Sequence, residues 1–239
     1  MNWNKIIYLL FVPIMANCQH ADKQPCDDSY VKGNNYLLSF DFNNALREFN
    51  AATSLNSNNA FAYYGKATIA LLNGDFDNAI NEVDTALQVD PNFTIGYYFR
   101  SSVNARRGHH DKALRDINKV ISLKPDFFYA YFARAIYEHA LGDNQSALAD
   151  IDKVIAYKPG YAEAYYNRAV YHNDQGDYKN ALNDMVKAIE LKSDNVDVFT
   201  LKGYFELMLG NREEGCRDLE KGKEAGDPKA QLYMDKYCK

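Results

Sequence analysis

The chain has 239 residues, 47% of them hydrophobic and 25% charged, a composition that excludes an intrinsically disordered protein. Its formal net charge of −5 provides no strong basic field, which argues against nucleic acid as a partner. Aromatic residues are unusually common at 14%, and Tyr alone occurs 19 times.

The first 18 residues differ in character from the rest of the chain. Lys5 is the only charged residue before Asp22, and an apolar run of ten residues, Ile6 to Met15, follows it. A membrane-spanning helix needs about 20 residues, so this run suits the core of a secretory signal better. It ends in Met15-Ala16-Asn17-Cys18, which resembles the lipobox of a bacterial lipoprotein, where the cysteine is lipidated and becomes the new N-terminus.

We interpret residues 1–18 as a signal peptide with Cys18 as the lipidation site, and residues 19–25 as a short linker. On this interpretation the protein is exported and held at a membrane only through its N-terminal lipid. Asn17 departs from the small residue that is usual at that place. Two alternatives stay open: a periplasmic or secreted protein cleaved near Ala16, and a cytoplasmic protein with an apolar N-terminus.

The remainder of the chain repeats itself every 34 residues. Pro91, Pro125 and Pro159 stand in similar contexts and are 34 residues apart. Extending this spacing in both directions gives six repeats: 26–59, 60–93, 94–127, 128–161, 162–195 and 196–229. Residues 230–239 then form one further helix that caps the end of the stack.

Small residues and glycine recur at fixed positions of the repeat. Positions 8 and 20 are always Gly, Ala or Ser, which allows two antiparallel helices to approach closely. Position 15 is Gly in all repeats but the first, where Phe40 stands, and glycine suits the left-handed conformation that ends a helix. Apolar residues between these positions are spaced by three and four, which predicts amphipathic helices. Each repeat is therefore expected to be a helical hairpin that buries its apolar face against its neighbours.

The pattern resembles the tetratricopeptide repeat (TPR) family, most fully in residues 162–195, AEAYYNRAVYHNDQGDYKNALNDMVKAIELKSDN. The resemblance implies an all-α fold: a right-handed TPR solenoid of six helix-turn-helix repeats with a C-terminal capping helix. It also implies that the first helices line a concave groove that binds another protein or a peptide. The Lys, Asn and Arg set with which some members bind a peptide's C-terminal carboxylate is absent from this sequence.

Position 7 is basic and position 23 is acidic in every repeat, from Lys32 and Glu48 to Lys202 and Asp218. We interpret these residues as a ladder of partly buried ion pairs between the two helices of each repeat. Because desolvation of the charges offsets much of their attraction, the ladder is expected to specify packing more than to add stability.

Aromatic residues also recur on the inner face of the predicted first helices. The rings at position 4 are expected to be core, and those at position 5 to be at least half exposed. Exposed Tyr rings suit binding because a rigid ring gives a large contact area for little loss of entropy. The residues predicted to contact a partner are Tyr64, Tyr98, Phe99, Tyr129, Phe132, Tyr166 and Tyr204.

Two of the four cysteines, Cys216 and Cys238, are placed so that a disulfide would hold the capping helix on the stack. The alternative to this disulfide is a pair of reduced thiols, and the bridge is expected only in an exported protein. No metal site, cofactor motif or catalytic triad is recognisable. The predicted function is a protein-binding scaffold of the cell envelope, not an enzyme. A self-associating structural protein and a carbohydrate-binding protein that uses the Tyr row are the alternatives.

Overall fold

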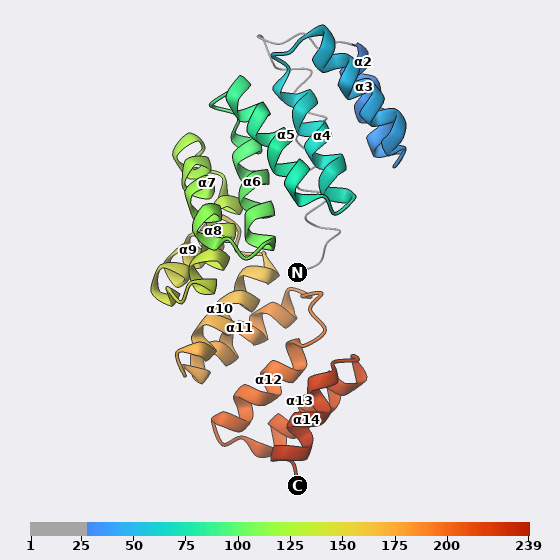
Figure 1. Cartoon of the computed structure of the whole chain (residues 1–239). Helices are drawn as coiled ribbons and strands as arrows, with labels where there is room; N and C mark the ends of the chain where they lie inside the picture. The colour runs from blue at the N-terminus through green and yellow to red at the C-terminus, as the bar shows by residue number, and fades with distance from the viewer. Residues whose placement is uncertain (1–27) are drawn as a thin grey trace. The chain divides into compact units, whose positions relative to one another are not determined.

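The structure is a computed structural model that describes residues 28–239. The predicted signal peptide with Cys18, the linker and Cys26 lie outside the described residues. The described part folds into thirteen α-helices and contains no strand (Figure 1). In chain order the helices are α2 (Asp28–Leu38), α3 (Phe42–Leu55), α4 (Ala60–Leu72), α5 (Phe76–Val89), α6 (Thr94–Arg106), α7 (His110–Leu123), α8 (Phe128–Ala140), α9 (Asn144–Tyr157), α10 (Ala162–Asp174), α11 (Tyr178–Glu190), α12 (Val198–Met208), α13 (Arg212–Glu224) and α14 (Pro228–Tyr237).

Successive helices form hairpins, α2 with α3 through α12 with α13, and α14 follows as an additional helix (Figure 1). The prediction of an all-α fold built from six helix-turn-helix repeats and a final helix is therefore confirmed. The chain divides into two compact units, of which one ends at Ala130 and the other begins at Tyr131. Helix α8 begins in the first unit and continues in the second.

Aspartate and glycine define the ends of most helices. An Asp side chain accepts a hydrogen bond from the backbone N–H three residues later and so caps the first turn of four second helices. These residues are Asp41, Asp75, Asp143 and Asp177. The position-15 glycines adopt positive φ values, from 75° at Gly108 to 88° at Gly210, as predicted. In the first repeat Phe40 adopts the same conformation, with φ 59°, which costs a non-glycine residue about 1 to 2 kcal/mol.

The small residues at positions 8 and 20 bring the paired helices together. In the sixth pair, a Cβ atom on Gly203 would lie 2.7 Å from the carbonyl oxygen of Gly215. A Cβ atom on Gly215 would in turn lie 2.9 Å from the carbonyl oxygen of Gly203. Because real Cβ atoms do not approach so closely, these two backbones meet only where both side chains are absent.

The core of the first unit is built around Phe49 of α3, which is 0% exposed. Its ring lies where side chains of Gly33 on α2 and Gly65 on α4 would otherwise be, 2.7 and 2.5 Å from their ideal Cβ positions. One large ring thus fills the space that two glycines leave open, and it packs three helices together. Tyr30 lies against the same ring, with the two centroids 6.1 Å apart.

In the second unit a comparable cluster joins α10, α11 and α12. Its fully buried side chains are Ala169, Ala181, Met185 and Phe205. As in the first unit, small side chains lie where two helices touch, and large side chains fill the space on either side. Both cores are therefore filled by side chains from successive helical pairs, as stacked repeats require.

Candidate functional site

The predicted ion-pair ladder forms in five of the six helical pairs. Lys66 Nζ on α4 lies 2.9 Å from Glu82 Oε1 on α5. The later pairs are Arg100 with Asp116 (2.6 Å), Arg134 with Asp150 (2.5 Å), Arg168 with Asp184 (2.7 Å), and Lys202 with Asp218. In the first pair, Arg47 and not Lys32 is the residue that contacts Glu48 among the described residues.

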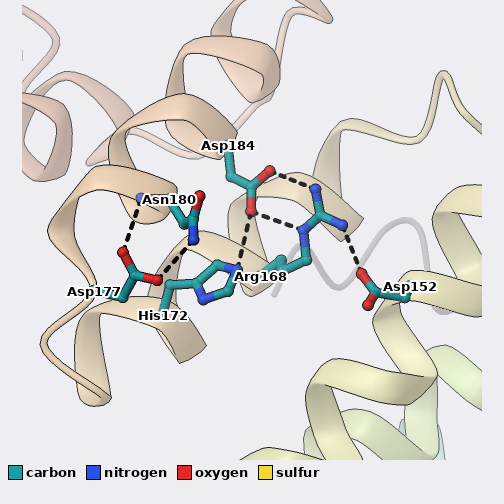
Figure 2. Close-up of polar contacts among 6 residues, drawn as sticks. All are labelled: Asp152, Arg168, His172, Asp177, Asn180 and Asp184. Atoms are coloured by element: carbon teal, nitrogen blue, oxygen red, sulfur yellow. Dashed lines mark hydrogen bonds and ion pairs between the residues drawn. The ribbon is translucent and has the colours of Figure 1, made fainter.

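Figure 2 shows that Arg168 also joins two successive pairs. From α10, its Nε and NH2 atoms donate to the two carboxylate oxygens of Asp184 on α11, at 2.8 and 2.7 Å. Its NH1 atom donates to Asp152 on α9, at 2.6 Å. The equivalent contacts in the first unit join Arg100 to Asp116 and Asp84. Because the guanidinium is occupied on both sides, we assign the ladder to packing and not to ligand binding.

The position-4 rings are partly exposed, and the expectation that they are core was wrong. The ring of Phe199 lies under Lys221 of α13. Each of the other four lies under the position-7 cation of its own helix, with the charge 5.3 to 5.6 Å from the ring centroid. These pairs are Tyr63 with Lys66, Tyr97 with Arg100, Tyr131 with Arg134 and Tyr165 with Arg168. Positions 4 and 7 are one turn apart, so the ring shares the half-exposed edge on which the ladder lies.

The position-5 rings are more buried than predicted. Two of the residues predicted to contact a partner, Tyr64 at position 5 and Phe99 at position 6, are fully enclosed. Tyr64 is 1% exposed and is enclosed by Phe93 and Phe99, whose centroids lie 5.8 and 5.3 Å from its own. Phe99 itself is 0% exposed. Neither ring is accessible to a partner, so Tyr64 and Phe99 belong to the core of the first unit.

The residue at position 34 of the repeat, to which the sequence analysis assigned no role, contributes to the burial of the position-5 rings. Position 34, the last of each repeat, is aromatic in three successive repeats: Phe93, Phe127 and Tyr161. Each of these rings packs edge-on against the position-5 ring of its own repeat, at centroid distances of 5.2 to 5.8 Å. The recurrence of an aromatic residue two places after each proline was the available signal.

The other predicted residues keep part of their surface exposed. In the first unit, Phe127 lies between Tyr98 and Tyr129, with centroid distances of 5.5 and 5.8 Å. In the second unit, Phe132 packs against Tyr161 at 5.2 Å. We call the partly exposed rings of each unit its aromatic surface: Tyr98, Phe127 and Tyr129 in the first unit, and Phe132, Tyr161, Tyr166 and Tyr204 in the second.

Tyr204 of α12 is part of a cluster of Tyr rings at the C-terminal helix. Its ring stacks on Tyr233 of α14 at 5.3 Å and lies 6.1 Å from Tyr178 and 6.4 Å from Tyr237. Leu232 of the same helix, α14, is 65% exposed. Helix α14 therefore packs on the stack mainly through aromatic side chains.

Glu138 of α8 is a largely buried carboxyl group beside the ladder. Its Oε1 atom lies 3.6 Å from Arg134 Nε. Its Oε2 atom and the hydroxyl of Tyr171 on α10 are buried and have no hydrogen-bond partner among the described residues. Burial raises the pKa of Glu138 to about 7, and the negative charge of Asp150 adds to this rise against the positive charge of Arg134.

Replacing Glu138 with Gln is expected to stabilise the protein more at pH 8 than at pH 5. Between its ordinary pKa of 4.5 and the folded value of about 7, the folded state keeps a proton that the unfolded state has released. The free energy of unfolding therefore falls as the pH rises through this window. The full difference in pKa corresponds to about 3.4 kcal/mol, and solvent screening of this partly exposed group reduces the expected fall to about 2 kcal/mol. Urea unfolding of wild type and Glu138→Gln at both pH values measures the difference.

The matched control for this prediction is Glu206→Gln, at the same repeat position of α12, where the carboxylate lies 3.7 Å from Lys202. Glu206 is about as buried as Glu138, but its Oε2 atom accepts a hydrogen bond from Asn211 at 2.7 Å. If both variants responded to pH in the same way, the unsatisfied Oε2 atom of Glu138 would not be the cause. If Glu138→Gln destabilised the protein at pH 8, the attraction between the carboxylate and Arg134 would outweigh the cost of burying its charge.

Cys216 on α13 and Cys238 at the end of α14 are joined as a disulfide in the structure, with their Cα atoms 5.8 Å apart. Residues 28–239 contain no group of three His, Cys, Asp or Glu side chains arranged to hold a metal ion. Within the same residues, no helix combines the length and the apolar character that crossing a membrane requires.

Comparison with known proteins agrees with the repeat architecture. The model of the tetratricopeptide repeat family matches residues 30–92, 103–162 and 132–196, which together make up more than half of the chain. A search of curated proteins gave no match.

Solved structures with the same fold include three TPR proteins of low sequence identity. The MamA protein is 23% identical over 72% of this chain and 94% of its own, with a TM-score of 0.64. YrrB, described as a TPR protein with an unusual peptide-binding site, is 19% identical over 79% of this chain and 97% of its own, with a TM-score of 0.66. The pilF protein of Pseudomonas aeruginosa is 13% identical over 85% of this chain and 94% of its own, with a TM-score of 0.75.

Repeats of this kind generally serve as scaffolds for protein–protein contacts and not as catalysts. The spacing of the repeats, the thirteen helices and the matches over most of the chain all agree. The chain belongs to the tetratricopeptide repeat family.

Proposed function

We propose that the protein is an adaptor that binds a peptide or a helix of another protein on its aromatic surface. The observation that carries this proposal is the partial exposure of rings that already pack edge-on in pairs, Tyr98 with Phe127 and Phe132 with Tyr161. Such rings are held in place before a partner arrives, so binding loses little side-chain entropy. They also combine a large apolar area with polar hydroxyl groups at the edge, a combination common at protein interfaces.

We also propose that this adaptor works outside the cytoplasm and is anchored through a lipid on Cys18. The proposal is supported by the apolar run and the lipobox-like residues 15–18 of the sequence. The Cys216–Cys238 bridge is consistent with an oxidising compartment. Labelling of growing cells with a fatty-acid analogue should mark wild type and leave Cys18→Ala unmarked, and equal labelling of the two would exclude Cys18 as the anchor.

The double variant Tyr98→Ala/Phe132→Ala should lose partner binding and keep its fold. Removal of these two partly buried rings is expected to lower the affinity for a partner at least tenfold, because aromatic residues dominate the binding energy of most interfaces. Affinity capture from an envelope extract of the source cells, followed by mass spectrometry, compares the proteins retained by wild type and by the variant. Circular dichroism checks that the variant remains helical.

Tyr157→Ala is the matched control, because it removes an exposed ring from α9, a second helix, where no binding surface is proposed. Proteins lost with the double variant and retained by the control would be the partners. If all three forms retained the same proteins, the aromatic surface would serve packing alone, and the proposal would fail.

A further inference from the structure

The first turn of α12 has no side-chain cap, although an Asp precedes it, as one precedes the four second helices whose first turn is capped. Asp197 stands at the capping position, but its carboxylate accepts no hydrogen bond from the backbone of its own helix. It instead accepts the hydroxyl proton of Tyr166 on α10, whose oxygen lies 2.9 and 3.0 Å from the two carboxylate oxygens. Because capping by Asp stabilises a helix by about 1 kcal/mol, this orientation sacrifices a local gain and directs a carboxylate to the aromatic surface.

A second carboxylate, that of Asp227, lies near enough to act electrostatically on Tyr166. Asp227 caps α14 by accepting the N–H of Lys229 through Oδ1, at 3.0 Å. Its Oδ2 atom is buried and has no hydrogen-bond partner among residues 28–239, although the residue is only 5% exposed. A buried carboxylate oxygen without a partner is unfavourable, and a positive charge nearby relieves the cost.

The two carboxylates belong to one region of the second unit. The hydroxyl of Thr200, one turn after Asp197, adjoins Gly222, and the carbonyl oxygen of Gly222 accepts the N–H of Asp227 at 3.0 Å. The turn between α13 and α14 therefore lies against the first turn of α12. Burial and the negative charges of Asp197 and Asp227 raise the pKa of Tyr166, so its hydroxyl remains a neutral donor at physiological pH.

No cation of the described chain compensates these charges. Among residues 28–239, no Lys, Arg or His side chain forms an ion pair with Asp197 or Asp227. The cations on the first helices of the second unit are already held by carboxylates of the ladder: Arg134, Arg168 and Lys202. Two negative charges beside a partly exposed ring create a local field that attracts a positive group from outside.

We propose that Tyr166, Asp197 and Asp227 form an acidic site that binds a Lys or Arg side chain of the segment docked on the aromatic surface. Asp197, which is partly exposed, contacts the bound cation, and the buried charge of Asp227 adds to the negative potential at the site. The Tyr166 ring supplies an aromatic edge to the site. Two carboxylates fall short of the oxygen set that a divalent metal requires, whereas they suit an ammonium or guanidinium group. This inference rests on the proposed peptide-binding function.

A library of random 12-residue peptides displayed on phage tests the inference. Wild type, Asp197→Asn/Asp227→Asn and the control Glu213→Gln are each used for selection. Asn retains an oxygen for Tyr166 and for the cap of α14, so the fold should persist, and circular dichroism checks this. Asp197→Asn alone replaces the double variant if the latter unfolds. Glu213 lies exposed on α13, where among the described residues it pairs with Arg217, so its variant matches the single change in charge of Asp197→Asn at a place away from the site.

The expected result is that wild type and Glu213→Gln select peptides enriched in Lys and Arg. The peptides selected should bind the double variant about tenfold more weakly, and their affinity for wild type should fall as salt is added. Peptides selected without an excess of Lys or Arg, or an excess that persists in the double variant, would overturn the acidic site and leave peptide binding intact. Recovery of no peptide at all would overturn both.

Discussion

Replacement of Phe49 with Ala is expected to lower the free energy of unfolding of the first unit by about 4 kcal/mol. The ring is fully buried, and it occupies the space beside Gly33 and Gly65, so these two nearest positions offer no side chain to fill the cavity. The loss therefore combines the transfer energy of the ring with the cost of the empty volume. Urea unfolding followed by circular dichroism measures it, with hydrogen exchange of α2, α3 and α4 to identify the unit that opens.

Phe40→Ala is the control for this prediction, since Phe40 is an exposed ring of the same unit and should cost less than about 1 kcal/mol. The packing also predicts a coupling. A side chain on Gly65 would collide with the Phe49 ring, so Gly65→Ala should be much less harmful beside Phe49→Leu than alone. Additive effects of the two changes, or a cost for Phe49→Ala close to that of the control, would contradict the packing described here.

The sequence predicts most of the fold because each repeat meets the same local requirements. Gly108 and Gly210 end helices with positive φ, and Gly203 and Gly215 bring two backbones together, as their positions in the repeat indicate. These roles depend on a residue's own conformation or on its nearest helical neighbour. A 34-residue period that preserves them therefore determines the helical pairs with little further information.

The binding surface is less predictable, because burial of a ring depends on which side chains of the following segments cover it. Tyr64 and Tyr98 occupy the same repeat position, yet Tyr64 is buried and Tyr98 is partly exposed. Phe93 and Phe127 pack against these rings from the residue before the next helix, where helical spacing no longer fixes the direction of a side chain. Tyr64 is also enclosed by Phe99, which makes the difference.

The contacts of Asp197 show a second limit of sequence patterns. An Asp immediately before a helix predicts a cap, as Asp177 illustrates by accepting two hydrogen bonds from Asn180 (Figure 2). Asp197 has the same local position but contacts Tyr166, 31 residues earlier in the chain. When a side chain can bond either to its own helix or to a residue far away in the sequence, its partner is predicted correctly only if the position of the distant residue is known.

Reduction of the Cys216–Cys238 disulfide should lower the free energy of unfolding of the second unit by about 3 kcal/mol. The bridge spans a separation of 22 residues and ties α14 to α13, so its removal frees the unfolded chain from a closed loop. The stacked ring of Tyr233 on Tyr204 should hold α14 only weakly once the bridge is open. Urea unfolding with and without a reducing agent gives the difference, and Cys216→Ser/Cys238→Ser should match the reduced wild type.

The redox state of the two cysteines in the cell bears on the proposed location as well as on stability. Alkylation of the protein from its source cells, followed by peptide mapping, should leave both Cys216 and Cys238 unlabelled before reduction. Thiols are kept reduced in the cytosol and are oxidised outside it, so this result would agree with export. If both residues were labelled and the reducing agent left the stability unchanged, the protein would contain no Cys216–Cys238 disulfide in the cell. The disulfide would then give no support to an extracytoplasmic location. The repeat fold, which depends on glycine and ring packing, would stand either way.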